Sequence, residues 1–269
     1  MHTLANRLVV ITGGASGIGR ELGHQFAWRG ARVAVTDRDR PGAEATAEAL
    51  RKTGIDARAY AMDVTSESDV AAARAAITAD MGPTDILVNN AGVVFGGAFL
   101  DVPLASHVKT VRVNVEGVMI VTHAWLADLI GRPEAHIVNI ASASSFVGLP
   151  FGASYGASKW AVLGLTESLR LELKHLGHRH VGTTAICPSY VATGMFDGAQ
   201  APRLTSTLTP ERVAALTVRA VLTGRQEVLT PWLVRLTPLL RGVLPRPVFD
   251  AVAAAFGVNT SMLSWRGRV

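Results

Sequence analysis

The sequence predicts an α/β fold built on one doubly wound, parallel sheet. Short β-branched runs alternate with alanine-rich, helix-length segments along most of the chain. The runs are almost wholly apolar, as in Val33-Ala34-Val35 and Ile86-Leu87-Val88, which suits strands that helices cover on both faces. A glycine-rich turn also separates the first run from the first helical segment. Together these features indicate a Rossmann-type architecture.

Six strands are expected, and three helix starts carry recognisable signals. The strands are predicted at Leu8–Thr12, Arg32–Asp37, Ala57–Ala61, Asp85–Asn89, His136–Ala141 and Val181–Cys187. Ser66 with Asp69 three residues later, Pro103 ahead of Leu104, and Thr209-Pro210 mark helix starts, because these residues cap a helix or fit its first turn. The first helix is predicted over 20–29.

Length and composition favour one domain over the whole chain, 1–269. Of the 269 residues, 49% are hydrophobic and only 17% are charged, which is enough to fill a sizeable core. No internal repeat, low-complexity run or linker interrupts the chain. The tail over 226–269 differs in its apolar character and is expected to be a helical C-terminal extension.

Charge and cysteine usage exclude several classes of function. The net charge of +5 is scattered, without a basic block interleaved with aromatic residues, so no nucleic acid partner is expected. His175, His178 and His180 lack a cysteine or carboxylate at ligand spacing, so we expect a basic helix end and no metal. The single cysteine, Cys187, and the early first strand favour a cytoplasmic protein without a signal peptide.

The glycine-rich turn predicts a dinucleotide site. It reads Thr12-Gly13-Gly14-Ala15-Ser16-Gly17-Ile18-Gly19 and lies between the first strand and the first helix. Glycines let the backbone approach a pyrophosphate, whose charge then lies at the helix N-terminus. A glycine-rich loop alone also occurs as a flexible turn, so its place between strand and helix is what favours a nucleotide.

Asp37 ends the second strand about 20 residues beyond this turn, where an acidic residue accepts hydrogen bonds from the adenosine ribose. Arg38 follows and is the residue type that accommodates the 2′-phosphate of NADP. That phosphate would face the Asp37 carboxylate, and like charges so placed cost several kcal/mol. The sequence therefore predicts NAD as the cofactor.

From residue 12 to residue 193 the motifs resemble those of the short-chain dehydrogenase/reductase family. Its glycine motif matches 12–19 in full, and further family motifs follow in order: Asp63-Val64, Asn89-Asn90-Ala91-Gly92, Asn114, Ser142 and Tyr155-Gly156-Ala157-Ser158-Lys159. The resemblance implies that the cofactor contacts Gly13, Ser16, Gly17, Ile18, Gly19, Asp37, Arg38, Asp63, Val64, Asn90, Ala91, Gly92, Tyr155, Lys159, Pro188, Val191 and Thr193. Ser189 replaces the usual glycine of the Pro-Gly loop, which adds strain if that position needs a positive φ.

The resemblance implies a catalytic group of Asn114, Ser142, Tyr155 and Lys159. Tyrosine has a pKa of about 10 and is a poor base at pH 7, so we expect the Lys159 ammonium and the ring of oxidised NAD to lower the pKa of Tyr155. Ser142 is expected to bind the substrate oxygen, and Lys159 to bind the nicotinamide ribose. Asn114 either supports a proton-relaying water or simply bonds to nearby backbone.

Apolar residues near these motifs predict a lipophilic substrate, an alcohol or its ketone, although each of them could equally fill the core. The predicted pocket residues are Val94, Phe95, Ser144, Phe146, Leu149, Tyr190, Met195 and Phe196, with Val93 and Val147 beside them. This pattern and the long apolar tail resemble the subgroup of retinol and hydroxysteroid dehydrogenases.

The tail places Trp232, Leu236, Leu239, Leu240 and Val243 on one predicted helical stripe. It is too short to span a bilayer; it covers the substrate cleft, contacts a membrane surface peripherally, or packs on the domain. A homodimer or homotetramer through the helices around 104–130 and 154–175 is implied by the resemblance alone. The alternatives are an NADPH-dependent reductase of the 3-oxoacyl-carrier-protein type and, outside enzymes, a cofactor-sensing protein.

Overall fold

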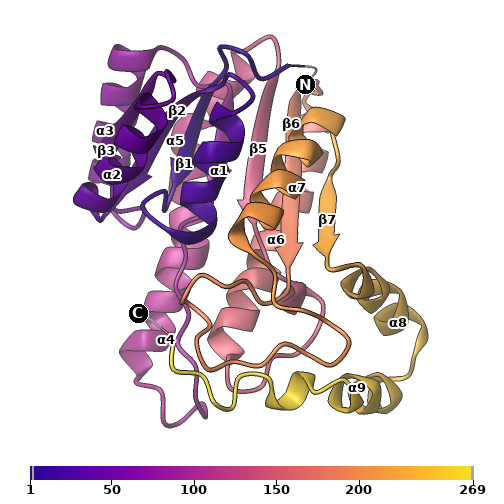
Figure 1. Ribbon diagram of the computed structural model, residues 1–269. Helices are drawn as coiled ribbons and strands as arrows, with labels where there is room; N and C mark the ends of the chain where they lie inside the picture. Colours follow the sequence, from indigo (N-terminus) through magenta and orange to yellow (C-terminus); the bar gives the residue numbers. More distant parts are fainter. Residues whose placement is uncertain (2, 268–269) are drawn as a thin grey trace.

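The computed structural model describes residue 1 and residues 3–267, and these form one seven-stranded sheet (Figure 1). All neighbouring strands are parallel, in the order β3-β2-β1-β4-β5-β6-β7. The strands are β1 Leu8–Thr12, β2 Arg32–Asp37, β3 Ala57–Ala61, β4 Ile86–Asn89, β5 Ala135–Ile140, β6 Val181–Pro188 and β7 Glu227–Thr230. The strand order reverses between β1 and β4, which is where doubly wound sheets bind ligands. The predicted fold class is confirmed.

Helices cover both faces of the sheet. The helices before the C-terminal extension are α1 Gly17–Ala27, α2 Arg40–Arg51, α3 Glu67–Met81, α4 Leu104–Val111, α5 Gly117–Ile130, α6 Ala153–His175 and α7 Pro210–Thr223. One core joins α1, α2 and α7 to side chains such as Val9 and Ile11, and a second joins α3 and α5 to Leu8 and Val10. Successive residues of β1 thus serve opposite cores, as the pleat of a strand requires.

The predicted elements agree closely with the structure. The bounds of the first three strands are those expected, β4 and β6 differ by one residue at one end, and β5 differs by one residue at both ends. Ser66 and Thr209 cap α3 and α7, accepting from the backbone N–H groups of Asp69 and Arg212 at 3.2 and 3.3 Å. The first helix begins at Gly17, three residues before its predicted start. The short edge strand β7 was not predicted.

The C-terminal extension lies beyond the carboxyl ends of β6 and β7 (Figure 1). It consists of a 3₁₀ turn at Trp232–Leu236, α8 Thr237–Val243, α9 Arg246–Ala255 and a second 3₁₀ turn at Val258–Thr260. The chain then returns toward the loop after β4, where a side chain on Gly96 would collide with the Trp265 ring. Residues 268–269 of the predicted tail lie outside the described residues.

One helical stretch, Leu104–Ile130, is long and apolar enough to cross a membrane by length and composition. In this fold it packs on the sheet, with Val121, Trp125 and Leu129 fully buried. Its first half leaves Leu104 and Val108 exposed beside α6. The stretch is therefore a core helix with one apolar outer face.

At the amino edge of the sheet, Asp85 forms a buried ion cluster. It is 2% exposed and accepts from the Leu8 backbone N–H at 2.9 Å. Arg7 donates to the same carboxylate at 3.0 Å, and Arg132 donates through Nε at 2.9 Å. The cluster ties the start of β1 to β4 and to the turn before β5, far from the carboxyl edge of the sheet.

Candidate active site

The glycine turn and the start of α1 form an anion cradle. Gly13 and Gly17 have φ angles of +66° and +53°, in the left-handed region that favours glycine. A Cβ on Gly13 would lie 2.8 Å from the Ala91 Cα, so the turn packs directly on the loop after β4. Ser16 precedes α1 without a side-chain cap bond, and the first turn contains no acidic residue. Free N–H groups and the helix dipole are therefore available to a pyrophosphate.

Thr12 joins this cradle to the end of β4. Its Oγ1 accepts from the backbone N–H groups of Asn90 and Ala91, both at 3.0 Å. The Asn90 amide donates in return to the carbonyls of Thr12 and Gly13 at 2.9 and 3.0 Å. These bonds give the two loops one fixed shape.

Asp37 ends β2 with its carboxylate held by backbone amides. Oδ2 accepts from Ala15 N at 3.0 Å, and Oδ1 accepts from Asp39 N at 3.0 Å. A carboxylate has about four acceptor positions, so acceptor capacity remains for two ribose hydroxyls. Arg38 is exposed beside it and also lines the cleft.

A cleft of about 710 Å³ runs along the carboxyl edge of the sheet. It is lined by every predicted cofactor residue except Gly19. Gly19 lies behind the cradle, where a Cβ would collide with the Gly13 carbonyl, so it lets α1 pack closely and does not face the cleft. A glycine turn, a free helix start and an acidic strand end along one cleft fit a dinucleotide.

Ser142, Tyr155 and Lys159 meet where this cleft ends. Ser142 follows β5, and its Oγ accepts from Ser144 N at 3.1 Å. Tyr155 and Lys159 lie one turn apart on α6, and the Lys159 ammonium is 5.6 Å from the centre of the Tyr155 ring. Lys159 Nζ donates to the Ile140 carbonyl at 2.7 Å, which holds the ammonium under the cleft.

Burial governs the protonation of this group. It raises the pKa of the Tyr155 hydroxyl, and an interaction with the Ser142 hydroxyl opposes that rise. Burial lowers the pKa of Lys159 to about 8, so at pH 7 its charged form still dominates. The resting tyrosine is therefore a protonated acid. The lowering of the Tyr155 pKa that is expected from Lys159 and oxidised NAD together stays a prediction.

Asn114 lies in a π-helical turn, Arg112–Glu116, between α4 and α5. It is fully buried, with Oδ1 accepting from Val93 N at 2.8 Å and Nδ2 donating to the Val93 carbonyl at 2.9 Å. Nδ2 also donates to Ser158 Oγ at 3.0 Å. The amide thus bonds to nearby backbone, and its part in supporting a proton-relaying water stays a prediction. Asn114 fastens the loop after β4 to α6 beneath Lys159.

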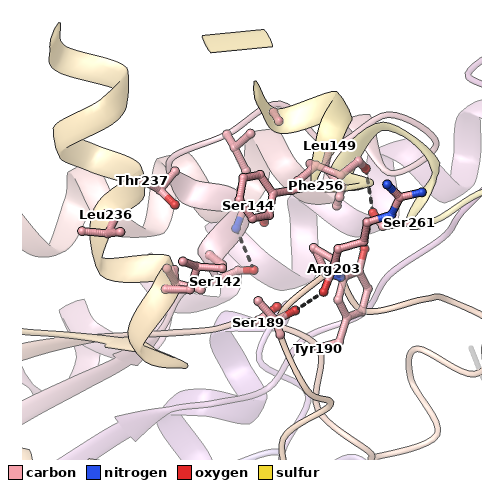
Figure 2. Close-up of a pocket in the computed structure, with 18 of the residues that line it drawn as sticks. Ser142, Ser144, Leu149, Ser189, Tyr190, Arg203, Leu236, Thr237, Phe256 and Ser261 are labelled. Atoms are coloured by element: carbon pink, nitrogen blue, oxygen red, sulfur yellow. Dashed lines mark hydrogen bonds between the residues drawn. The ribbon is translucent and has the colours of Figure 1, made fainter. Parts of the chain in front are cut away.

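A second cavity, of about 200 Å³, opens beside Ser142 and Tyr155 and is walled mainly by apolar side chains. Figure 2 shows Leu236 and Thr237 on one side of it, Tyr190, Arg203 and Phe256 on the other, and Ser142 and Ser144 between them. Phe196 lines both this cavity and the cleft, and its ring meets the Tyr155 ring edge-on at 5.6 Å. Tyr155 is therefore shared between a dinucleotide-sized cleft and an apolar cavity.

The structure divides the predicted pocket residues. Ser144, Leu149, Tyr190 and Phe196 line the apolar cavity, as does Val147. Met195 lines the cleft instead, together with Val93. Three predicted residues line neither space: Val94 is fully buried in the core against Tyr155, Phe95 lies beneath Lys109, and Phe146 packs on the core of α6. Being close to a motif in sequence did not distinguish core from cavity.

The C-terminal extension supplies much of the cavity wall. From the sequence, covering the substrate cleft was one of three roles considered for this tail. Its contributing residues are Leu233, Val234, Leu236, Thr237, Leu240, Phe249, Val252, Ala253, Phe256, Val258 and Ser261. Tyr190 donates to Ser261 at 2.7 Å, and fully buried Met262 packs in the same cluster as Tyr155. Ser189 has no positive φ, so its replacement of glycine adds no strain of that kind.

The predicted stripe of the extension is split. Leu236 and Leu240 face the cavity, whereas Trp232, Leu239 and Val243 point away from it. The reason is that Leu239 and Leu240 are consecutive residues of α8 and therefore point in directions about 100° apart, and Val243 follows Leu239 by one turn. Only part of the stripe therefore covers the cavity.

Comparison with known proteins agrees with this geometry. The family model described as short chain dehydrogenase matches residues 7–203. Human 17-beta-hydroxysteroid dehydrogenase 13 is 31% identical over 243 residues, which cover 90% of this chain and 81% of that protein. Human epidermal retinol dehydrogenase 2 is 31% identical over 262 residues, covering 96% and 85%. The crystal structure of a short chain dehydrogenase/reductase from Burkholderia phymatum in complex with NAD has a TM-score of 0.82 and 30% identity, covering 90% of this chain and 95% of that one.

Proposed function

The chain belongs to the short-chain dehydrogenase/reductase family, among members similar to retinol and hydroxysteroid dehydrogenases, and from this we propose an NAD-dependent oxidoreductase that interconverts a lipophilic alcohol and its carbonyl compound. The observation that carries the proposal is the shared position of Tyr155. It lines both the cleft with the dinucleotide features and the apolar cavity. A carbinol carbon held there lies between a proton-transferring group and the cofactor site.

The residues divide the work as their positions suggest. NAD, when bound, supplies the hydride acceptor, and NADH the hydride donor. The Ser142 hydroxyl donates to the substrate oxygen and orients it toward Tyr155. Tyr155 donates its proton to that oxygen in reduction and accepts it in oxidation. Lys159, held by the Ile140 carbonyl, places positive charge beneath the cleft and stabilises the ionised tyrosine.

Asp37 is expected to set the cofactor preference. The wild type should prefer NAD(H), and Asp37→Ala should lower the ratio of kcat/KM for NAD(H) over NADP(H) by at least about tenfold, or roughly 1.4 kcal/mol. The substitution removes a ribose acceptor and the repulsion of a 2′-phosphate. Steady-state kinetics with both cofactors measure the ratio.

Asp39→Ala is the matched control for this test. Asp39 lies two residues away and caps α2 through Gly42 N at 3.1 Å, but it does not line the cleft. Its loss should leave the ratio nearly unchanged. A wild-type preference for NADPH would show that Arg38 outweighs Asp37 and would favour the ketone reductase alternative.

The apolar cavity predicts a preference for long-chain substrates. In a series of primary alcohols, kcat/KM should climb with each methylene that enters the cavity and then level off. Burial contributes about 0.8 kcal/mol per methylene, so four of them should raise kcat/KM by about two orders of magnitude. Absorbance of reduced nicotinamide follows the rate.

Leu240 and Leu239 offer a matched pair on α8. Leu240 lines the cavity and Leu239 points to solvent. Leu240→Ser should flatten the chain-length series, and Leu239→Ser should leave it intact. Best activity on a sugar or a small hydroxy acid would show that the cavity does not hold the substrate.

A further inference from the structure

The C-terminal extension carries an unpartnered apolar stripe on its outer side. Three residues that point away from the cavity, which we call the outer stripe, are Trp232, Leu239 and Val243. Their exposed fractions are 67%, 64% and 69%. Single exposed apolar side chains are ordinary, but three large ones on the same side of one short segment mark an interaction surface.

The inner side of the same element already has its partner. Leu233, Leu236, Thr237 and Leu240 face the apolar cavity. The outer stripe therefore contributes nothing to the wall of that cavity. A helix that only closed the cavity would need a single apolar side and would be polar on the other.

Charge around the outer stripe has one sign. Between Glu227 and Asp250 the sequence contains no acidic residue and three arginines, Arg235, Arg241 and Arg246. Arg241 is used inside the protein, 3.8 Å above the Trp160 ring and donating to the Phe146 carbonyl at 3.2 Å. Arg235 and Arg246 are exposed near the two ends of the outer stripe.

We propose that the outer stripe is a docking surface for a bilayer that contains anionic lipids. Exposed leucine, valine and a tryptophan suit the boundary between headgroups and acyl chains, where an amphipathic helix lies flat. Exposed arginines complement anionic headgroups, whereas a second copy of this chain would present the same positive charge to them. The additional claim that a lipophilic substrate passes from the bilayer into the cavity behind α8 rests on the proposed function.

Co-sedimentation with vesicles tests the docking. The full chain is mixed with vesicles of phosphatidylcholine, with and without phosphatidylserine, at low ionic strength. Wild type should sediment with the vesicles that contain phosphatidylserine and only weakly with the neutral ones. Leu239→Glu should lower the partition coefficient at least about tenfold, through lost apolar contact and added repulsion. The double variant Arg235→Gln, Arg246→Gln should lower it about thirtyfold on anionic vesicles, and less on neutral ones.

Leu176→Glu is the matched control. Leu176 is 59% exposed, close to the exposure of Leu239, but it lies just after α6, at the amino ends of the strands. The outer stripe lies beyond their carboxyl ends. This variant should bind vesicles like wild type. Circular dichroism and NADH titration verify that each variant is folded.

Three results would overturn the proposal. The first is no vesicle binding by wild type, and the second is equal vesicle binding by Leu239→Glu and wild type. The third is a lower molar mass of Leu239→Glu in light scattering with vesicle binding unchanged, which would assign the outer stripe to a second copy of the chain. These measurements involve no substrate, so a failed chain-length series would count against the proposed function while leaving the docking result to stand.

Discussion

Tyr155→Phe is expected to lower kcat by about 10²- to 10⁴-fold, the range usual for loss of a general acid or base. Only the proton-transferring oxygen is removed, and the ring keeps its edge-on contact with Phe196. NADH binding should therefore stay within a few-fold of wild type. Calorimetric titration with NADH and a turnover assay measure the two effects separately.

The pH dependence gives this test a second readout. Since burial raises the pKa of Tyr155, the ionised base is a small fraction at neutral pH, and oxidation by the wild type should accelerate as the pH rises. That acceleration should be absent in Tyr155→Phe. Tyr60→Phe is the control. Tyr60 lies on β3, away from the site, and its hydroxyl donates to Asp80 of α3 at 3.1 Å. Substantial residual turnover in Tyr155→Phe would refute the acid–base role.

Asp85→Ala should lower the free energy of unfolding by about 3 kcal/mol. The substitution leaves the Leu8 N–H without its acceptor and two arginines without their counter-ion in a buried cluster. The arginine side chains are 23% and 28% exposed, so water moderates the loss. Urea denaturation with an unchanged m-value measures it.

Asp128→Ala is the comparison for this effect. Asp128 accepts from Arg74 Nε at 2.7 Å in a more exposed pair, and loss of such a pair costs about 1 kcal/mol or less. The cofactor cleft is remote from Asp85, so NADH affinity of the folded Asp85→Ala protein should be unchanged. Equal losses of stability in the two variants would mean that the buried cluster makes no special contribution.

The sequence by itself determined the features that depend on neighbours along the chain. Apolar β-branched runs predicted six strands to within one residue at each end, because a covered parallel strand requires that composition. The glycine turn, Asp37 and the Tyr155–Lys159 pair were identified for a similar reason. Each is local, and the carboxyl ends of parallel strands bring them to one edge.

Only the tertiary structure decided features that depend on contacts between distant segments. Strand β7, at the edge of the sheet, is defined by its pairing with β6. Val94, Phe95 and Phe146 resemble cavity residues in sequence. In the fold, Val94 packs against Tyr155, Phe146 packs on the core formed with α6, and Phe95 lies beneath Lys109 of α4. In the same way, Leu240 of α8 lines the cavity and Leu239 beside it is exposed, because of what packs on each side of the helix. The same leucine side chain can line a cavity, fill a core or lie exposed. Which of these occurs depends on the distant segments that pack against it.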